Sequence, residues 1–268
     1  MNKIKTALIS VWDKTGIVDL AKFLDGNNVE IISTGGTKKI LEDNGINVTS
    51  VSDITKQKEV MNGRVKTLHP KIFGGILADR NNENHLNDLL DMGGKTLDIV
   101  VVNLYPFKSE AIDKNLSLDK AIEYIDIGGP SMLRAAAKNY QSTIPLCDPS
   151  QYDGFMESFN LSSGLINLDQ RVDYASSVFK LAANYNMDIS NYFSKNNNPN
   201  RMLLDLNKVD DLRYGENPHQ SASFYLPEDA KQDWKQHHGK QLSYNNYYDI
   251  ETAYSIVNDF DDISCVII

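Results

Sequence analysis

The sequence is poor in cysteine, in long apolar runs and in positive charge. Its two cysteines, Cys147 and Cys265, are too few for a disulfide framework, as expected of a cytoplasmic protein. No apolar run approaches the roughly 20 residues that a membrane-spanning helix needs, and the segment 1–5 lacks the layout of a signal peptide. Acidic residues outnumber basic ones by 36 to 27, and the charge of −9 argues against generic binding to nucleic acid or to an anionic membrane.

Several signatures of cofactor and metal binding are also missing. There is no Gly-x-x-x-x-Gly-Lys P-loop, and no Gly-x-Gly-x-x-Gly follows an expected strand. A His-Glu-x-x-His motif is absent, and the adjacent His237 and His238 are poorly placed to chelate one metal ion. The sequence therefore predicts no metal site.

What the sequence does contain is an alternation of apolar strands and amphipathic helices. Strands are expected at residues 6–10, 29–33, 47–51, 98–104 and 142–146. Helices are expected at residues 15–24, 38–43, 83–92, 118–124, 132–140 and 169–185. The β-branched run in 98–104 is typical of a central strand covered on both faces. This alternation predicts an α/β fold with a parallel sheet.

A polar run at residues 194–200 predicts a boundary between two domains. We expect a first domain at 1–195, a linker at 196–202 and a second domain at 203–268. In the second domain, strands are expected at 203–209, 222–225, 241–244 and 264–268, and a helix at 250–260. Because a bare apolar strand needs a covering partner, the last of these predicts that the chain is a fragment of a longer protein.

The densest cluster of reactive groups is Gly63-Arg64-Val65-Lys66-Thr67-Leu68-His69-Pro70. A guanidinium can grip an anion through two hydrogen bonds, while an ammonium acts as a compact charge. The cluster predicts a site for a phosphorylated small molecule that carries a second reactive oxygen.

Further polar groups follow the expected strands, and ligands of open α/β sheets bind beyond the carboxyl ends of the strands. Thr34-Gly35-Gly36-Thr37 offers two glycines, two hydroxyls and the amides of a helix N-terminus, which suit a phosphate. An ordinary capped turn is an equally good interpretation of this segment alone.

At the same rim, Tyr105 either donates to a developing oxyanion or packs against the following proline.

Two charged residues flank the next helix. Asp126 precedes it, where an aspartate is most often a cap. Lys138 follows three alanines, where desolvation would lower its pKa and suit it to proton transfer, although a solvated helix face is the alternative. Beyond the expected linker, the polar segment 212–220 is interpreted either as a binding loop or as a structural or partner-contacting loop.

Six ordered motifs resemble those of one enzyme family. They are residues 10–16, 33–37, 63–70, 103–107, 125–129 and 134–139. The chain resembles the bifunctional purine-biosynthesis proteins that combine IMP cyclohydrolase with AICAR transformylase, and segments 213–220 and 239–246 are similar to the opening motifs of the transformylase half. Trp12 departs from the pattern, because many members carry a small hydroxyl residue there, so only backbone contacts are expected from it.

The resemblance implies a fold and a reaction. The first domain would be a methylglyoxal-synthase-like parallel five-stranded sheet with helices on both faces, followed by the truncated start of an α/β transformylase domain. In the reaction, the carboxamide nitrogen of FAICAR attacks the formamido carbonyl and water leaves, giving IMP without a metal or cofactor. The full-length protein would be a homodimer that uses 10-formyltetrahydrofolate as co-substrate. Because this chain stops before the family's catalytic Lys-His pair, we expect it to lack formyl transfer.

The resemblance also implies roles for individual residues. Lys66 and Tyr105 would stabilise the reacting oxygen, while Asp126 and Lys138 would handle the carboxamide proton. The nucleotide would contact Ser10, Trp12, Asp13, Lys14, Ser33, Thr34, Gly35, Gly36, Thr37, Arg64, Val65, Thr67, Val102, Asn103, Ile127 and Gly128. AICAR would contact Arg213 and Tyr214. The phosphate is expected at the 33–37 turn, and His69 and Pro70 are expected to be structural.

Two other functions remain open. One is a non-catalytic regulatory module that binds a phosphorylated ligand, as the same fold does in carbamoyl phosphate synthetase. The other is methylglyoxal synthase, whose Asp/His signature is not evident in this sequence.

Overall fold

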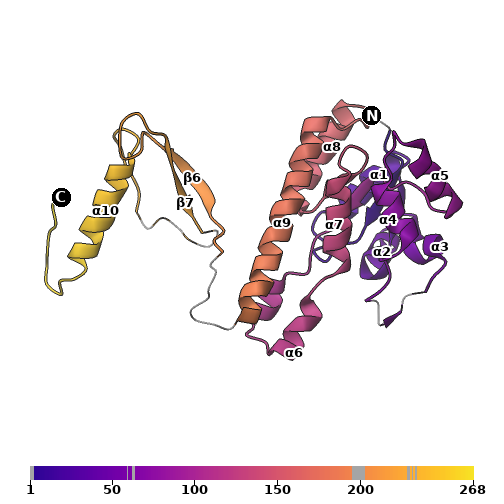
Figure 1. Cartoon of the computed structure of the whole chain (residues 1–268), viewed down its shortest axis with the longest axis horizontal. Coiled ribbons are helices and arrows are strands. Elements are labelled where there is room, and N and C mark those ends of the chain that lie inside the picture. Colours follow the sequence, from indigo (N-terminus) through magenta and orange to yellow (C-terminus); the bar gives the residue numbers. More distant parts are fainter. Residues whose placement is uncertain are drawn as a thin grey trace. The chain divides into compact units, whose positions relative to one another are not determined.

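The computed structural model describes residues 3–58, 60–61, 64–194, 203–227, 230, 232 and 234–268. The chain divides into two compact units, Met1–Asn197 and Asn198–Ile268 (Figure 1). The expected linker, 196–202, lies outside the described residues, so the expected domain boundaries stay a prediction.

A parallel sheet forms the centre of the first unit. Its five strands are β1 (Thr6–Ile9), β2 (Glu30–Ser33), β3 (Val48–Ser50), β4 (Ile99–Val101) and β5 (Ile144–Leu146), in the order β3-β2-β1-β4-β5. The predicted parallel five-stranded sheet is confirmed. Ile9 pairs with Ser33 on one side and Val101 on the other, so the segments that follow β1, β2 and β4 leave the sheet at one edge.

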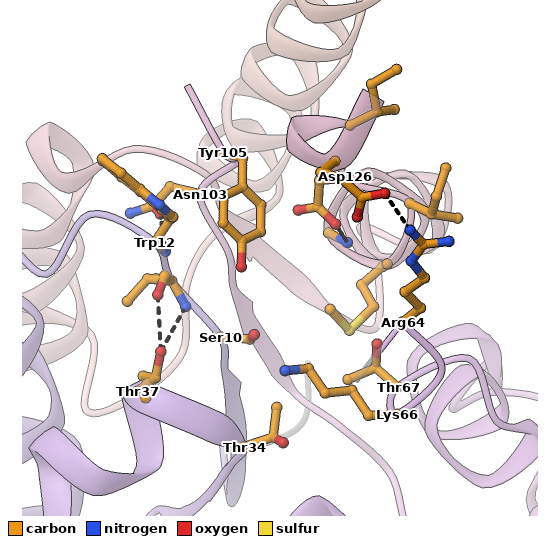
Figure 2. A pocket seen from close by; sticks show the side chains of 18 of the residues that line it. Ser10, Trp12, Thr34, Thr37, Arg64, Lys66, Thr67, Asn103, Tyr105 and Asp126 are labelled. Atoms are coloured by element: carbon orange, nitrogen blue, oxygen red, sulfur yellow. Dashed lines mark hydrogen bonds and ion pairs between the residues drawn. The ribbon is translucent and has the colours of Figure 1, made fainter. Parts of the chain in front are cut away.

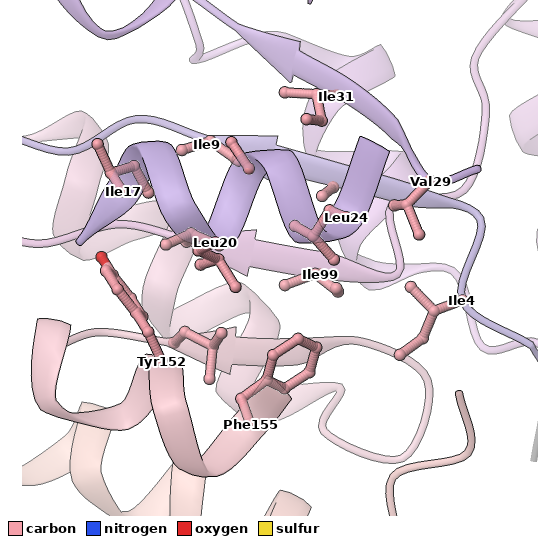
Figure 3. Close-up of a cluster of buried hydrophobic side chains, with 14 of the residues drawn as sticks. Ile4, Ile9, Ile17, Leu20, Leu24, Val29, Ile31, Ile99, Tyr152 and Phe155 are labelled. Carbon is pink, nitrogen blue, oxygen red and sulfur yellow. The ribbon is translucent and has the colours of Figure 1, made fainter. Parts of the chain in front are cut away.

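Helices cover both faces of this sheet, as predicted. Successive side chains of a strand point to opposite faces, and in β1 Ile9 packs on one face while Leu8 packs on the other. The first face carries α1 (Ile17–Gly26), α2 (Gly35–Asp43) and α8 (Tyr152–Leu161). Apolar side chains of these helices pack with those of the strands in one buried cluster, part of which is drawn in Figure 3. The second face carries α4 (Pro70–Leu77), α7 (Gly128–Lys138) and α9 (Leu168–Ser194).

Short elements complete the first unit at the ends of the sheet. They are α3 (Val51–Thr55), α5 (Glu83–Asp91), a π-helical turn (Lys108–Ile112), α6 (Leu118–Ala121) and two 3-10 turns (Ile122–Tyr124 and Pro149–Gln151). Phe107, Ala111 and Ala121 pack with Tyr185 of α9 in a third apolar cluster. This cluster holds the segment before α7 against α9.

Several helix boundaries differ from the predictions. α7 begins at Gly128 instead of residue 132, because a proline is tolerated in a first turn, where its missing N–H has no helical partner. α9 runs to Ser194, beyond the expected end at residue 185. α4 was not expected, because its two glycines lower helix propensity. One of them, Gly75, is required by packing, since a Cβ there would lie 2.4 Å from the Lys95 carbonyl oxygen.

His69 and Pro70 define the start of α4. His69 is the N-cap, and its Nδ1 accepts a hydrogen bond from the Lys71 N–H at 3.1 Å. Pro70 occupies the first helical position, where its fixed φ suits the helix. Both residues therefore have a structural role, as the sequence predicted.

The second unit contains an antiparallel pair, β6 (Asn207–Leu212) and β7 (Ala222–Leu226), and the helix α10 (Tyr244–Val257). Three predictions for this unit are wrong. The strand expected at 203–209 is shifted to β6, and residues 241–244 form no strand, because Ser243 caps α10 with Asn246 in a reciprocal pair. Residues 264–268 are irregular and have no ladder partner among the described residues, so this run is not the expected strand.

A membrane-spanning helix needs roughly 20 apolar residues, and the described helices of this protein differ from that pattern. None of those in the described part of the chain has the length and apolarity to cross a bilayer.

Candidate active site

A pocket of about 1260 Å³ opens beyond the carboxyl ends of β1, β2 and β4 (Figure 2). It is lined by Ser10, Val11, Trp12, Lys14, Thr34, Gly36, Thr37, Met61, Arg64, Lys66, Thr67, Asn103, Tyr105, Ile122, Glu123, Ile125, Asp126, Ile127, Gly128, Gly129 and Met132. The chain runs from β1 to β2 on one side and returns to β4 on the other. The pocket therefore lies at the point of a doubly wound sheet where ligands bind.

The N-terminus of α2 forms one end of the pocket. Thr34 caps the helix in an extended conformation, and Gly35 follows with a φ of +56°, which favours glycine. A Cβ on Gly35 would lie 3.3 Å from the Lys66 Nζ, so the glycine also leaves room for this ammonium. Helix amides, a helix dipole and a positive side chain together make a site for an anion.

Lys14 adds a second positive charge at this end. Its ammonium donates hydrogen bonds to the carbonyl oxygens of Val11 and Trp12 and, at 3.3 Å, to the Thr37 hydroxyl. Burial lowers the pKa of Lys14; the nearby Lys66 charge lowers it further, and Asp13 opposes both. Two neighbouring cations, one of them desolvated, favour an anion between them.

Asn103 holds the loop that follows β1. Its Oδ1 accepts hydrogen bonds from the N–H groups of Trp12 at 2.6 Å and Asp13 at 3.0 Å, and its Nδ2 donates to the Asp13 carbonyl at 2.9 Å. The Asp13 carboxylate accepts from the Thr15 amide and hydroxyl. Asn103 therefore positions this loop, and the Asp13 side chain stabilises the turn that contains Thr15.

Lys66 and Tyr105 supply hydrogen-bond donors inside the pocket. Lys66 is half-buried and makes no hydrogen bond or ion pair with any residue that the structure describes. The Tyr105 hydroxyl points toward the middle of the pocket in Figure 2, and its ring lies 6.4 Å from that of Trp12, centroid to centroid. Both donors are available to an oxygen atom of a ligand.

Asp126 faces Lys66 from the segment before α7. Its Oδ1 caps the helix by accepting the Gly129 N–H at 3.0 Å, and its own N–H donates to the Tyr185 hydroxyl at 2.7 Å. Burial raises the pKa of Asp126, opposed by the amides of Gly129 and Gly128 and by the charge of Lys66. A Cβ on Gly129 would lie 2.3 Å from the Asp126 Oδ2, so this carboxylate needs a glycine beside it.

An exposed ion pair joins the two sides of the pocket. The Arg64 guanidinium lies 2.5 Å from the Glu123 carboxylate, and both residues line the pocket. Solvent-exposed pairs of this kind contribute little to stability. The ion pair therefore keeps the Arg64 guanidinium at the pocket but does not fix its position.

Some predicted residues lie outside the pocket. Lys138 is exposed at the last position of α7, while the last α7 residue that lines the pocket is Met132, roughly 9 Å away along the helix axis at 1.5 Å per residue. Ser33 is fully buried, and its hydroxyl donates to the Ile9 carbonyl at 2.7 Å. The proposed direct roles of Lys138 and Ser33 are therefore not supported by their positions.

The remaining predicted residues are placed as follows. Asp13, Gly35, Val65 and Val102 do not line the pocket but adjoin residues that do. Gly63 lies outside the described residues. Arg213 and Tyr214 belong to the second unit, where the guanidinium lies 4.9 Å from the centre of the tyrosine ring.

Sequence reasoning missed an apolar wall of the pocket. Met61, Ile122 and Met132 lie between the polar motifs along the chain, and they line the cavity together with Ile125 and the predicted Ile127, which belong to one of those motifs. Single apolar residues between motifs give no recognisable signal. In the described part of the chain, no three His, Cys, Asp or Glu side chains gather closely enough to hold a metal ion.

Comparisons with known proteins agree with this architecture. Residues 16–131 match the MGS-like domain family, and residues 136–268 match the AICARFT/IMPCHase bienzyme family. A solved structure, titled "Crystal structure of ForH", superposes with a TM-score of 0.64 at 32% identity and covers 71% of this chain and 97% of that chain. The fold is thus that of an MGS-like α/β protein.

Two bacterial relatives identify the family more narrowly. The bifunctional purine biosynthesis protein PurH of Clostridium botulinum (strain Hall) is 45% identical over 265 residues, and that of Clostridium acetobutylicum is 46% identical over the same length. The chain belongs to the PurH family. Each match covers 98% of this chain and 53% of the relative, so the chain spans about half the length of these relatives.

Proposed function

We propose that this chain is an IMP cyclohydrolase, which closes the second ring of the purine by converting FAICAR to IMP and water. The observation that carries the proposal is the convergence of Lys66, Tyr105 and Asp126 on one pocket that also contains the N-terminus of α2. The reaction needs an anchor for a phosphate, a polariser for the formyl oxygen and a proton acceptor, and these groups match the three requirements.

The substrate would bind with its 5′-phosphate at α2. Thr34, Gly36 and Thr37 line this end of the pocket, and Lys14 and Lys66 bring positive charge to it. The apolar wall, which includes Ile125 and Met132, would pack against the base. This orientation places the formamido and carboxamide groups toward Tyr105 and Asp126.

Ring closure forms a bond between the carboxamide nitrogen and the formyl carbon. As negative charge develops on the formyl oxygen, the Tyr105 hydroxyl and the Lys66 ammonium donate hydrogen bonds to it. The Asp126 carboxylate accepts one proton from the attacking nitrogen and returns it to this oxygen. The resulting carbinol then loses its oxygen as water together with a proton from the other ring nitrogen.

The test is to add FAICAR to the purified chain and to follow the ultraviolet spectrum of IMP. We expect Lys66→Ala to slow turnover by about 10²–10³, the usual cost of removing one oxyanion donor, while circular dichroism stays unchanged. Lys39→Ala, an exposed lysine of α2 outside the pocket lining, removes the same charge and serves as the matched control. Near-normal turnover by Lys66→Ala would contradict the assignment. Binding of IMP by a chain that shows no turnover would favour the regulatory-module alternative.

For the full-length protein we propose a cytoplasmic homodimer that also transfers a formyl group from 10-formyltetrahydrofolate to AICAR. The match of residues 136–268 to the bienzyme family supports this second activity. Arg213 and Tyr214 are the proposed AICAR contacts, and the guanidinium lies over the tyrosine ring, 4.9 Å from its centre. Unchanged formyl transfer by full-length Arg213→Ala would contradict the role of this arginine.

A further inference from the structure

A second, smaller cavity of about 280 Å³ adjoins the phosphate end of the pocket. It is lined by Thr34, Ser50, Val51, Ser52, Gln57, Lys58 and Lys66. Thr34 and Lys66 line both cavities, so the small cavity begins where the proposed phosphate site ends. At about 30 Å³ per water molecule, its volume corresponds to roughly nine waters, which is room for a phosphate group.

The described lining of the small cavity carries charge of one sign. Lys58 and Lys66 contribute ammonium groups, and none of the lining residues that the structure describes is acidic. Neither lysine makes a hydrogen bond or ion pair with another described residue. Two cations that face one cavity repel each other, and an anion between them removes this repulsion.

Neutral hydrogen-bond groups surround these cations. The Ser50 and Ser52 hydroxyl oxygens lie 2.7 Å apart and share one hydrogen, which leaves the other O–H able to donate to a ligand. The Gln57 side chain adds an amide. β3 places these groups, because Ser50 pairs with Ser33 at the carboxyl end of the neighbouring strand β2. Ammonium and hydroxyl donors around one cavity are the groups that bind phosphate.

We propose that the small cavity is a second phosphoryl subsite, which binds the β-phosphate of a nucleoside 5′-diphosphate whose α-phosphate occupies the α2 site. This inference rests on the proposed function, because it uses the phosphate position at α2. A diphosphate that bridges the two cavities engages Lys66 from both sides. Nucleoside 5′-diphosphates are therefore competitive inhibitors of ring closure.

Calorimetric titration of the whole chain with inosine 5′-monophosphate and inosine 5′-diphosphate tests the subsite. We expect the diphosphate to bind at least about tenfold more tightly, as one added set of charge-assisted hydrogen bonds predicts. Lys58→Ala removes this advantage and leaves monophosphate binding unchanged. Lys39→Ala, the same loss of charge on an exposed face of α2, leaves both affinities unchanged. Ser52→Ala provides a second variant that weakens only the diphosphate.

The other outcomes separate the possible failures. Equal affinities for the two nucleotides, or a Lys58→Ala variant that weakens both alike, would overturn the subsite and leave the proposed function intact. Failure of the monophosphate to bind would overturn the phosphate position at α2, and the proposed function with it. Inorganic phosphate that binds to the chain saturated with monophosphate, and does so only when Lys58 is present, would confirm the subsite with a free ion as its occupant.

Discussion

Asp126 has a structural and a chemical role in the same carboxylate. Its Oδ1 caps α7, and the Tyr185 hydroxyl holds its backbone N–H, so two bonds fix its position in the pocket. Burial raises the pKa of the carboxyl and also raises that of Tyr185, to about 12. A carboxylate with a raised pKa is a stronger base, and this suits it to accept a proton from a weakly acidic amide.

The raised pKa of Asp126 predicts a pH dependence of kcat/KM. The basic form is the active one, so kcat/KM rises with pH through a pKa above the ordinary aspartate value of about 3.9. We expect Asp126→Asn to lose this acidic limb of the pH profile and to slow turnover by about 10²–10⁴. Asp126→Glu is expected to keep an acidic limb, because it retains a carboxylate. The measurement is the pH profile of IMP formation. An acidic limb that persists unchanged in Asp126→Asn would contradict the role.

The raised pKa of Asp126 makes the stability of the fold change with pH in the opposite direction to activity. Because the folded state favours the protonated carboxyl, Asp126 stabilises the fold below its unfolded pKa, and this contribution is lost as pH rises through the raised folded pKa. Activity therefore increases over the range in which this contribution to stability decreases. Asn at this position removes both dependences.

Among the elements, β4 is anchored at its start by buried charge. The Asp98 carboxylate accepts hydrogen bonds from the N–H groups of Lys5 and Thr6 and lies 3.6 Å from the Arg80 guanidinium. Burial lowers the pKa of Arg80 and of Arg171, and the charge of Asp98 opposes both shifts. This acid therefore offsets two buried cations at the edge of the sheet opposite the pocket.

Replacing the acid at the start of β4 is expected to be costly. Asp98→Asn leaves the Arg80 guanidinium without its counter-charge, and we expect the free energy of unfolding to fall by about 3–5 kcal/mol. Glu30→Gln breaks the exposed pair with Lys95, 2.5 Å long, and is expected to cost less than about 1 kcal/mol. Urea denaturation of the two variants measures the contrast. Equal losses would contradict the assignment of a buried ion pair.

Elements with a strong local signal could be predicted from the sequence, and the others could not. The β-branched run of β4 and the glycine-rich start of α2 mark the sheet and one end of the pocket without reference to other segments. The resemblance assigns Lys138 and Asp126 one shared role in proton transfer, but the length of α7 separates them in space. α4 could not be predicted, because Gly75 is required by its close approach to the Lys95 backbone. Local helix propensity does not reveal such a contact.

At the scale of the whole molecule, the pocket belongs to one unit. Its lining residues in the described part of the chain all fall within Met1–Asn197, and a solved chain of which this protein covers 97% has the same fold. The protein is acidic, with a charge of −9, whereas the described linings of the pocket and the adjoining cavity carry four cations, Lys14, Lys58, Arg64 and Lys66, against two acids, Glu123 and Asp126. An anionic substrate is therefore attracted to one local region of a surface that otherwise repels it.

The separation into units predicts that the first can act alone. A chain that ends after Ser194 is expected to convert FAICAR to IMP at the rate of the whole chain, because every pocket residue is retained. Its thermal unfolding midpoint is expected to match that of one transition of the whole chain. Turnover and calorimetry measure the two quantities. Loss of folding or of turnover on this truncation would contradict the independence of the unit.

Trp12 also makes the pocket optically observable. The chain has two tryptophans; one lines the pocket beside Tyr105, and the other, Trp234, lies in the second unit against Tyr247. Indole emission responds to nearby charge and to exclusion of water. In a Trp234→Phe protein, all tryptophan fluorescence would therefore come from the pocket, and an unlabelled protein would report its own occupancy.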